Sequence, residues 1–456
     1  MVNTPEICLS GKRIFFSGIC GISVSSLALL SKEAGCLIMG SDIGNNPQAI
    51  RELNENGIKV IQKHSSENVH GSDIFVHTSA VTENNPELVE AKRLGLPTYT
   101  RAEFMQMLMS EYGNRIGISG THGKSTVSGM LTHIISMCGC DCTALIGARF
   151  AESGKAYRLG KSDTVIFEAC EYKRSFLNFR PTVATVLNIE KDHTDCYQSL
   201  EDSVEAFKEY AKKAKICVLN YDDLSVRKLK DITSKPFFFS SNNEKADIYM
   251  HDLKETGGLH SFVAVTKKGE SAEVKLSVPG IHNAVNALAA VATAYALGYP
   301  LDKCASAVSS FRGMKRRFEH IGSCGDAEVY DDYAHHPTEI KTALDTARRM
   351  EFSKIVCAFQ PHTYSRTKDL FDEFIKAFEY ADEVFIADIY AAREKNTFGV
   401  TSKMLADSIN GAEYVPELEE MADKLRKFRD RGTVILTIGA GELDRVAEKV
   451  VDLRKN

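Results

Sequence analysis

A glycine-rich segment between a short apolar run and a helix-like run places the strongest constraint on how this chain can fold. Residues 116–135 read IGISGTHGKSTVSGMLTHII, so Gly123, Lys124 and Ser125 follow a predicted strand and begin a predicted helix. Such a helix start presents backbone N–H groups and the positive end of the helix dipole, which both favour phosphate. The spacing differs from the standard loop G-x-x-x-x-G-K-[ST], because only two residues separate Gly120 from Gly123. A plain strand-to-helix turn therefore stays open as an alternative at this point.

The size and composition fit a multidomain globular protein. The chain has 456 residues, and at roughly 100–200 residues per domain two to four domains are expected. The net charge of -5 and the lack of a basic block in the sequence argue against nucleic acid or an acidic membrane surface as a partner. No apolar run is long enough for a membrane span and no secretion signal is visible, so the expected location is the cytoplasm. The twelve cysteines include no CxxC pair, which favours buried, reduced thiols over a metal site.

Strand-like and helix-like runs alternate along three segments of the sequence. The first contains KRIFFSG, CLIMGSDI and SDIFVHTSAV; the second contains RIGIS, DTVIFEA, PTVATVLNI and AKICVLN; the third contains AEVYDDYA, KIVCAFQP, EVFIADIY and GTVILTIGAG. This alternation predicts α/β domains built on parallel sheets with right-handed crossovers. An irregular β-rich stretch is expected from about residue 236 to 278, followed by an alanine-rich helix in NAVNALAAVATAYALG. We place the domain boundaries near residues 113 and 315.

Two further polar residues are expected to lie near the phosphate loop. Glu168 ends the predicted strand DTVIFEA, and His193 follows the predicted strand ATVLNI. Ligands collect at the carboxyl ends of the strands in an open α/β sheet, so these side chains would share one edge with Lys124 and Ser125. Lysine can reach terminal phosphates, and a serine hydroxyl and a carboxylate are oxygen ligands for Mg²⁺, which takes six. The sequence therefore predicts a magnesium–nucleotide site with Ser125, Glu168 and His193 as metal ligands.

Several motifs together resemble a known enzyme family. GTHGKST, FEACEYKRSFLNFRPTVATVLNIEKDHTD, PGIHNAVNALAA, KRRFE, YDDYAHHPTEI and QPHTYSRT occur in the order found in the Mur ligases, ATP-dependent amide ligases that build the peptidoglycan precursor. The resemblance runs from about residue 12 to 443, and the short loop spacing is normal in that family. It implies three domains: a Rossmann-like UDP-sugar-binding domain at 1–113, a central phosphate-loop ATPase-type domain at 114–315 and a Rossmann-like C-terminal domain at 316–456. It also favours the phosphate loop over a plain turn.

The resemblance also implies roles for individual residues, with ATP and Mg²⁺ (or Mn²⁺ in its place) as cofactors. The expected nucleotide-binding residues are Gly120, Thr121, His122, Gly123, Lys124, Ser125, Thr126, Asn283, Asn286, Arg317 and Asp332. Those expected to line the UDP-sugar site are Gly18, Gly21, Ser41, Asp42, His64, Ser79 and Arg101. Those expected to face the muramyl carboxylate and the incoming amine are His193, Tyr333, His335, His362 and Arg366. The catalytic residues would be Lys124, Glu168, His335 and Arg366.

The motif EACEYKRSFLNF favours the branch of the family that joins L-alanine to the lactyl carboxylate of UDP-N-acetylmuramate through an acyl phosphate. The expected partners are these two small molecules, with no nucleic acid and no membrane, and the chain is expected to be a monomer or a weak homodimer. Sister ligases that add a recycled tripeptide or another amino acid remain open. A non-catalytic UDP-sugar-binding paralogue also remains open, because Cys20 stands where the family usually has glycine and Glu442 where it has aspartate. A nicotinamide-dependent oxidoreductase is the weakest alternative, since it leaves Lys124 and Ser125 unexplained.

Overall fold

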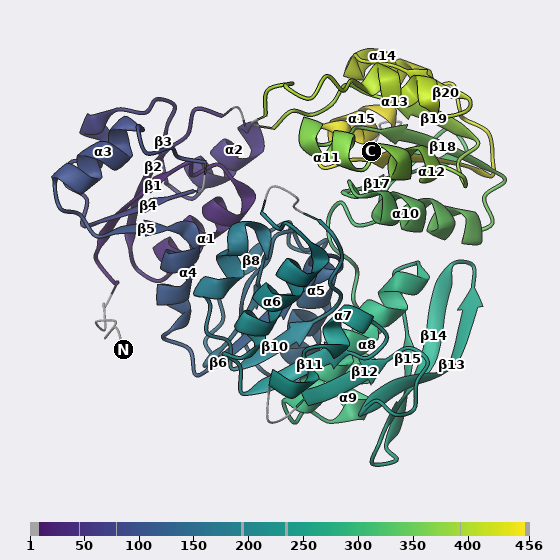
Figure 1. The fold of residues 1–456 in the computed structure, drawn as a ribbon, viewed down its shortest axis with the longest axis horizontal. Coiled ribbons are helices and arrows are strands. Elements are labelled where there is room, and N and C mark those ends of the chain that lie inside the picture. Colours follow the sequence, from purple (N-terminus) through teal and green to yellow (C-terminus); the bar gives the residue numbers. More distant parts are fainter. Residues whose placement is uncertain are drawn as a thin grey trace. The chain divides into compact units, whose positions relative to one another are not determined.

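Three β-sheets, of five, ten and six strands, organise the chain (Figure 1). This computed structural model describes residues 9–44, 46–78, 80–192, 196–232, 236–392 and 394–451. The chain divides into two compact units, Met1–Ile189 with Glu201–Leu219 and Asp223–Phe237, and Glu190–Leu200 with Asn220–Asp222 and Phe238–Asn456. Among the helices that the structure describes, none is both long and apolar enough to cross a membrane. The α/β class expected from the sequence is confirmed.

The first sheet has the strand order β3-β2-β1-β4-β5, and all of its pairings are parallel. Its elements are β1 (Arg13–Ser17), α1 (Ile22–Glu33), β2 (Leu37–Ser41), α2 (Pro47–Glu55), β3 (Val60–Ile61), η1 (Ser66–Val69), β4 (Ile74–His77), α3 (Pro86–Arg93), β5 (Thr98–Thr100) and α4 (Arg101–Met109). The chain runs outward from β1 in one direction to β3 and then returns to the other side at β4. Ligands of open parallel sheets bind where the strand order reverses in this way, at the carboxyl ends of the strands.

The second sheet has the order β15-β14-β13-β12-β11-β10-β6-β9-β7-β8. Its first elements are β6 (Asn114–Ser119), α5 (Lys124–Met137), β7 (Thr143–Leu145), β8 (Tyr157–Arg158), β9 (Thr164–Glu168), η2 (Tyr172–Asn178), β10 (Val183–Val186), α6 (Leu200–Ala211), β11 (Ile216–Asn220), α7 (Leu224–Arg227) and η3 (Lys230–Ile232). Strand β6 pairs in parallel with both β9 and β10. The loop that follows β6 therefore starts between the carboxyl ends of two neighbouring strands.

Helix α5 is buried more completely than the sequence predicts. The apolar side chains expected on one face, from Val127 to Ile135, are all fully buried. Ser128 and Thr132, which lie on the helix between them, are buried as well, and the Thr132 hydroxyl donates to the Ser128 carbonyl at 2.7 Å. The Thr132 hydroxyl is thus satisfied within the helix, whereas the buried Ser128 hydroxyl has no hydrogen-bond partner among the described residues. Because apolar and polar side chains are both buried, α5 behaves as a core helix and not as a surface helix with one apolar face.

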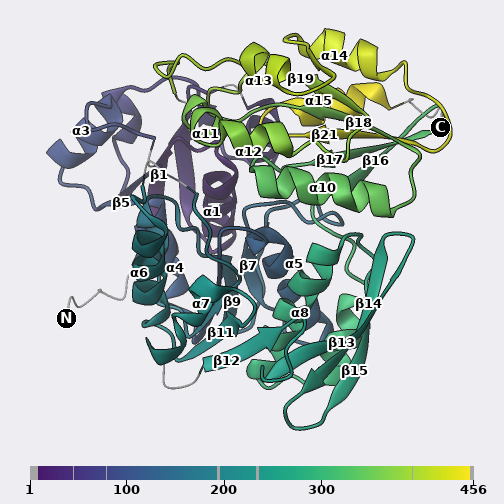
Figure 2. The same cartoon turned by 45° about the vertical axis from the view of Figure 1, so that its right-hand side comes forward.

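The β-rich stretch predicted near 236–278 is confirmed. It consists of β12 (Pro236–Ser240), β13 (Ile248–Thr256), β14 (Leu259–Thr266) and β15 (Ser271–Lys275), and β13, β14 and β15 pair antiparallel. The predicted alanine-rich helix is α8 (Ile281–Ala296), which packs against β13 and β14 and is followed by α9 (Leu301–Val308). Figure 2 shows the three antiparallel strands as a long ribbon beside α8.

The third sheet has the order β16-β17-β21-β18-β19-β20, with β16 as its one antiparallel edge strand. Its elements are β16 (Glu319–Cys324), β17 (Ala327–Asp332), α10 (Pro337–Arg349), β18 (Lys354–Phe359), α11 (Tyr364–Asp369), α12 (Phe371–Lys376), β19 (Glu383–Ile386), α13 (Ser402–Ser408), β20 (Ala412–Tyr414), α14 (Leu418–Leu425), β21 (Thr433–Ile438) and α15 (Leu443–Val450). Two apolar clusters cover its two faces, one with α10, α12 and α13 and the other with α14 and α15. The four strands predicted in this segment correspond to β17, β18, β19 and β21.

Candidate active site

The glycine-rich loop between β6 and α5 is held from outside by one residue that follows β10. The Asn188 carbonyl accepts the Thr121 N–H at 3.0 Å, and the Asn188 side chain exchanges hydrogen bonds with the backbone of His122 at 2.7 and 3.1 Å. Gly120 has φ +142°, and a Cβ atom there would lie 3.0 Å from the Leu187 side chain. Gly123 begins α5 with φ +85°. The loop is therefore fixed in a conformation that needs glycine at both positions, with its N–H groups at the start of a buried helix.

Lys124 is a buried cation at this loop. Its ammonium group donates to the carbonyl oxygens of Gly120 and Thr121 and lies 3.0 Å from a carboxylate oxygen of Glu171. Burial by itself would lower the pKa of Lys124, but the charges of Glu171, Cys170 and Glu168 and the hydrogen bond to Glu171 together outweigh burial, and the pKa is raised above its usual value. Lys124 therefore carries its charge throughout the neutral range.

Ser125 and Glu168, the two predicted metal ligands that the structure describes, come from adjoining elements. Ser125 lies in the first turn of α5, and Glu168 ends β9, which pairs directly with β6. One Glu168 oxygen accepts the Gly147 N–H at 2.6 Å. A hydroxyl and a carboxylate are hard oxygen donors of the kind that Mg²⁺ prefers, so the donor set fits that ion. His193, the third predicted ligand, lies outside the described residues.

The glycine loop that follows β1 is folded onto the end of β2. Gly18 has φ +81°, and the N–H groups of Gly18 and Ile19 donate to the Ser41 carbonyl at 2.8 and 3.1 Å. The Asp42 carboxylate accepts the Cys20 N–H at 2.8 Å, and Gly21 is the N-cap of α1. The loop thus keeps an ordered turn before a helix although Cys20 stands in it.

The Cys20 side chain is buried. Burial, together with the negative charge of Asp42, raises the pKa of the Cys20 thiol to about 12. The thiol therefore stays neutral in the physiological range, where it packs as a small apolar group. The departure from glycine at this position adds a buried side chain, whereas the backbone hydrogen bonds of the loop are formed.

Three of the four remaining predicted UDP-sugar residues lie within the described part of the chain. Ser41 and His64 meet at 3.0 Å, at the ends of β2 and β3. Arg101 begins α4, where its guanidinium donates to Ser23 at 2.9 Å; burial lowers its pKa, against the opposing charges of Cys170 and Glu168. Arg101 therefore lies close enough to Glu168 for their charges to interact. Ser79 lies outside the described residues.

A second cluster lies at the carboxyl ends of β17 and β18 in the C-terminal domain. Tyr333, His335 and His362 pack ring against ring, with centroid distances of 5.6 and 5.9 Å, and Arg366 contacts the His362 ring nitrogen at 3.2 Å. Arg366 also pairs with Asp192 at 3.3 Å. Four of the five residues that the sequence assigns to the reacting groups are thereby brought together, and the fifth, His193, lies outside the described residues. Burial lowers the pKa of His335 to about 4 and that of His362 to about 3, so both rings are neutral at pH 7.

The predicted nucleotide contacts Asn283, Asn286, Arg317 and Asp332 fall in two places. Asn283 and Asn286 lie one turn apart on α8, and the Asn286 amide donates to the Asn283 oxygen at 3.2 Å. Asp332 ends β17 and accepts two backbone N–H groups, from Phe318 and Ala334, at 2.7 Å each. Burial raises the pKa of Asp332 to about 6, against the opposing charge of Arg317, whose guanidinium stacks on the Tyr333 ring.

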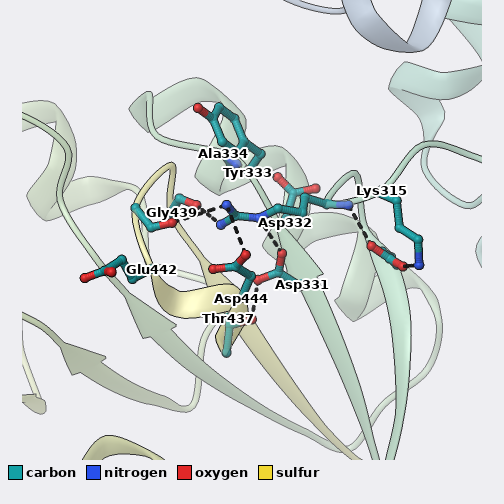
Figure 3. A network of polar contacts seen from close by, with 12 residues as sticks. Lys315, Asp331, Asp332, Tyr333, Ala334, Thr437, Gly439, Glu442 and Asp444 are labelled. Carbon is teal, nitrogen blue, oxygen red and sulfur yellow. Dashed lines mark hydrogen bonds and ion pairs between the residues drawn. The ribbon is translucent and has the colours of Figure 1, made fainter. Parts of the chain in front are cut away.

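Arg316, which the sequence analysis did not single out, lies at the centre of a polar network. Figure 3 labels its partners Asp331, Gly439 and Asp444. The Arg316 guanidinium pairs with Asp331 at 3.0 Å, donates to the carbonyl oxygens of Gly439 and Gly441, and lies 3.7 Å from Asp444. Asp331 in turn accepts the Thr437 hydroxyl at 2.6 Å, as Figure 3 shows. This arginine ties the start of the domain to β17, β21 and α15.

Glu442 takes no part in this network. Figure 3 shows its side chain turned away from Asp331 and Asp444, and it pairs with Arg445 at 2.8 Å. Its backbone N–H donates to the Gln360 side chain at 2.8 Å. A carboxylate that is longer by one methylene is therefore accommodated at the domain surface.

The fold and the site define a class of protein: a multidomain α/β enzyme with a phosphate loop. Models of the Mur ligase family match nearly the whole chain: the Mur ligase family catalytic domain at residues 13–113, the Mur ligase middle domain at 118–294, and the Mur ligase glutamate ligase domain at 316–441. The chain belongs to the Mur ligase family, and it is an ATP-dependent ligase of three α/β domains.

Individual relatives extend over the same length. The UDP-N-acetylmuramate–L-alanine ligases of Caldicellulosiruptor saccharolyticus and Caldicellulosiruptor bescii are 38% and 39% identical, over 96% of this chain and 98% of theirs. A solved UDP-N-acetylmuramate-alanine ligase from Thermotoga maritima has a TM-score of 0.83 at 28% identity, covering 96% of this chain and 98% of that one. A murein peptide ligase from Psychrobacter arcticus shares the fold, with a TM-score of 0.74 at 23% identity and coverage of 98% and 100%.

Proposed function

We propose that this chain joins L-alanine to the lactyl carboxylate of UDP-N-acetylmuramate, using ATP, in the synthesis of the peptidoglycan precursor. The observation that carries the proposal is the near full-length identity of 38–39% to ligases of that activity. The carboxylate attacks the γ-phosphate of ATP to give an acyl phosphate and ADP. The amine of alanine then attacks the carbonyl carbon, and the tetrahedral intermediate collapses to the amide and inorganic phosphate.

The residues at the phosphate loop have distinct tasks in this proposal. The first step brings two anions together, and Lys124 places a permanent positive charge at the loop where they meet. Ser125 and Glu168 would hold Mg²⁺, or Mn²⁺ in its place, with His193 as a further ligand. A bound divalent ion would offset the negative charge of the phosphate oxygens. The N–H groups of residues 120–126 would bind the phosphates, and Asn283 and Asn286 the adenine.

The C-terminal cluster is proposed to position the reacting carboxylate and amine. Arg366 supplies the charge that attracts the muramyl carboxylate, beside the rings of Tyr333 and His362. The Nδ1 atom of His335 lies 3.0 Å from the Tyr333 carbonyl, and because a carbonyl only accepts, Nδ1 carries the proton. The other ring nitrogen, Nε2, is then an unprotonated acceptor that orients the amine. With its pKa near 4, His335 is a weak base, so orientation is its main contribution.

Replacing His335 by alanine is expected to lower kcat by about 10–100-fold and to raise KM for alanine. Because burial holds the pKa of His335 near 4, its proton does not titrate between pH 6 and 8, and the shape of the pH–rate profile in that range should be unchanged. Steady-state kinetics at several pH values checks both points. His320→Ala, which removes a half-exposed ring paired with Glu328, is the control. Loss of an ionisation near pH 6.5 in the His335 variant alone would contradict this assignment.

The proposal also covers domain limits, assembly and location. We place the domain boundaries between residues 113 and 114 and between 315 and 316; the extents of the three family models support this division. We propose that the chain is a monomer or weak homodimer, and that it works in the cytoplasm on these two small molecules.

The test is release of inorganic phosphate from ATP and Mg²⁺ with UDP-N-acetylmuramate, with L-alanine, glycine, L-serine or the recycled tripeptide added singly. Release that requires both the sugar and L-alanine is the expected result. Release with the tripeptide alone would assign the chain to the sister branch that reuses peptides. Binding of the sugar without release for any amine would identify a non-catalytic paralogue.

A further inference from the structure

A fully buried carboxylate joins the ends of three strands in the N-terminal domain. Glu87, the second residue of α3, has no exposed surface. Its Oε2 atom accepts the hydroxyls of Ser17 at 2.6 Å and Ser41 at 2.7 Å, and lies 2.9 Å from Nδ1 of His64. Its Oε1 atom accepts the Asn68 amide at 2.7 Å. Ser17 ends β1, Ser41 ends β2 and His64 follows β3, so the carboxylate lies under the edge where this sheet would bind its ligand.

The four contacts identify Glu87 as an acceptor of hydrogen bonds. Both hydroxyls and the amide act as donors toward it, and an ionised carboxylate is a pure acceptor with room for about four hydrogen bonds. The positive end of α3 adds to its stabilisation, because Glu87 lies in the first turn of that helix. Within the part of the chain that the structure describes, His64 is the basic side chain that pairs with Glu87. Glu87 is thus buried as the common acceptor of these donors.

The acceptor role of Oε2 determines which nitrogen of His64 carries a proton. Since Oε2 can only accept, Nδ1 must donate, and the proton is on Nδ1 whether the ring is neutral or cationic. Nδ1 lies between Ser41 and Glu87, which are both fully buried, while the His64 side chain keeps 18% of its surface exposed. That exposure therefore belongs to the opposite edge of the ring, which carries Nε2.

We infer that Glu87 is the positioning residue of the nucleotide-sugar site: it holds His64 with Nδ1–H inward, so that Nε2 is presented to the bound UDP group. This inference rests on the proposed function for the class of ligand. Nε2 accepts from the nucleotide when the ring is neutral and donates to its diphosphate when the ring is protonated. In both protonation states of the ring, the contact between Nε2 of His64 and the nucleotide depends on the carboxylate of Glu87, which the nucleotide does not touch. Outer-shell carboxylates orient metal-binding histidines in the same way.

The test compares Glu87→Gln with Glu90→Gln. Glu90 lies on the same helix, is nearly buried, and also contacts a histidine, His70, at 2.9 Å, so it is a matched control for the loss of one charge. For Glu87→Gln we expect the Kd of UDP and the KM of the nucleotide sugar to rise about 10–100-fold, the range found for outer-shell partners, with kcat changed by less than about 3-fold. For Glu90→Gln we expect both constants to stay within about 2-fold.

The second readout is nitrogen NMR of protein labelled with ¹⁵N-histidine, recorded without ligand. We expect His64 to be protonated at Nδ1 in the wild type and in Glu90→Gln, and to shift to the Nε2–H tautomer in Glu87→Leu, which leaves no acceptor oxygen opposite Nδ1. Glu90→Gln controls for a general loosening of α3, because its His64 tautomer should stay unchanged. An unchanged tautomer in Glu87→Leu, or an unchanged Kd of UDP in a folded Glu87→Gln protein, would overturn the inference.

Two further variants keep the test decisive. If Glu87→Gln does not fold, Asn68→Ala releases Oε1 of Glu87 while the charge remains, and we expect UDP binding weakened by about 3–10-fold. His64→Gln and the double variant His64→Gln/Glu87→Gln should bind UDP equally weakly, because Glu87 acts through His64. A further loss in the double variant would contradict that. Failure of the wild type itself to bind UDP would reject the proposed function, whereas the tautomer readout tests Glu87 without ligand.

Discussion

Replacing Lys124 by alanine is expected to reduce amine-dependent phosphate release by at least about 1000-fold, the range for removal of a charge that stabilises a transferring phosphoryl group. Binding of the nucleotide sugar should persist, because its candidate residues belong to the domain of the five-stranded sheet. Lys124 begins α5, which follows β6 of the ten-stranded sheet. Phosphate release and UDP titration on the same preparations measure the two effects. Lys228→Ala, which removes a half-exposed lysine paired with Glu201, should leave both unchanged.

The Lys124 substitution is also expected to lower the stability of the protein, and the experiment must separate this loss from the loss of catalysis. Glu171 is buried, and without the lysine it would lose its cation, at a cost of about 3–5 kcal/mol in stability. The double variant Lys124→Ala/Glu171→Gln also removes the buried charge that has lost its lysine, so we expect it to recover most of the thermal stability and none of the activity. Recovery of activity in the double variant would contradict the role given to Lys124.

Replacing Arg316 by alanine is expected to destabilise the C-terminal domain by about 3–5 kcal/mol, the range for breaking a buried ion pair from one side. The variant leaves Asp331 buried beside the carbonyl oxygens of Gly439 and Gly441, which lose their guanidinium donor. Arg316→Lys should not restore stability, because an ammonium group cannot reach three acceptors in one plane. Because the chain has several domains, hydrogen exchange of peptides from β17 and β21 is a better measure than a single unfolding midpoint.

The effect of losing Arg316 should depend on pH. Burial raises the pKa of Asp331 to about 6, although Arg316 and Thr437 act in the opposite direction. The pKa of Asp331 is higher in the folded state than in the unfolded state, so ionisation favours the unfolded state. The contribution of Asp331 to the free energy of unfolding therefore falls as pH rises from about 4 to 6. Removing Arg316 raises that pKa further. The variant should therefore be less destabilised at pH 5, where Asp331 is protonated, than at pH 8.

Arg445→Ala is the control for this prediction. Arg445 lies on α15, is half-exposed and pairs with Glu442, so its loss should change stability by about 0.5 kcal/mol or less. Equal destabilisation of the Arg445 and Arg316 variants, or a loss for Arg316→Ala that is independent of pH, would contradict the importance given to the buried network.

Local patterns in the sequence predicted the elements of the fold well. Apolar runs ending in glycine or an acid gave β1, β2, β6 and β9, and the glycine-lysine-serine motif placed the start of α5 correctly. The short strands β3, β8 and β20 were not predicted, since two or three residues carry too weak a pattern. Strand order lay beyond the sequence as well, because pairing depends on contacts between distant segments.

The same limit applies to the candidate site. Gly120, Lys124 and Ser125 could be found because they follow one another at a fixed spacing. Asn188 and Glu87 could not, because they act on partners 66 and up to 70 positions away. A carboxylate after Asn85-Pro86 looks like an ordinary helix start, and only the folded chain reveals its four donors. The resemblance supplied Tyr333, His335 and Arg366, for which spacing alone gave no decision.

The shared carboxylate of Glu87 has a consequence for how this domain can change over generations. One acceptor, Glu87, is shared by Ser17, Ser41, His64 and Asn68. A substitution at any of these four residues therefore changes how much the others contribute to stability and binding. Substitutions at these four positions should therefore occur together, or only rarely. Anyone who wishes to redirect the domain to another nucleotide sugar would do better to transplant it whole than to exchange single loops.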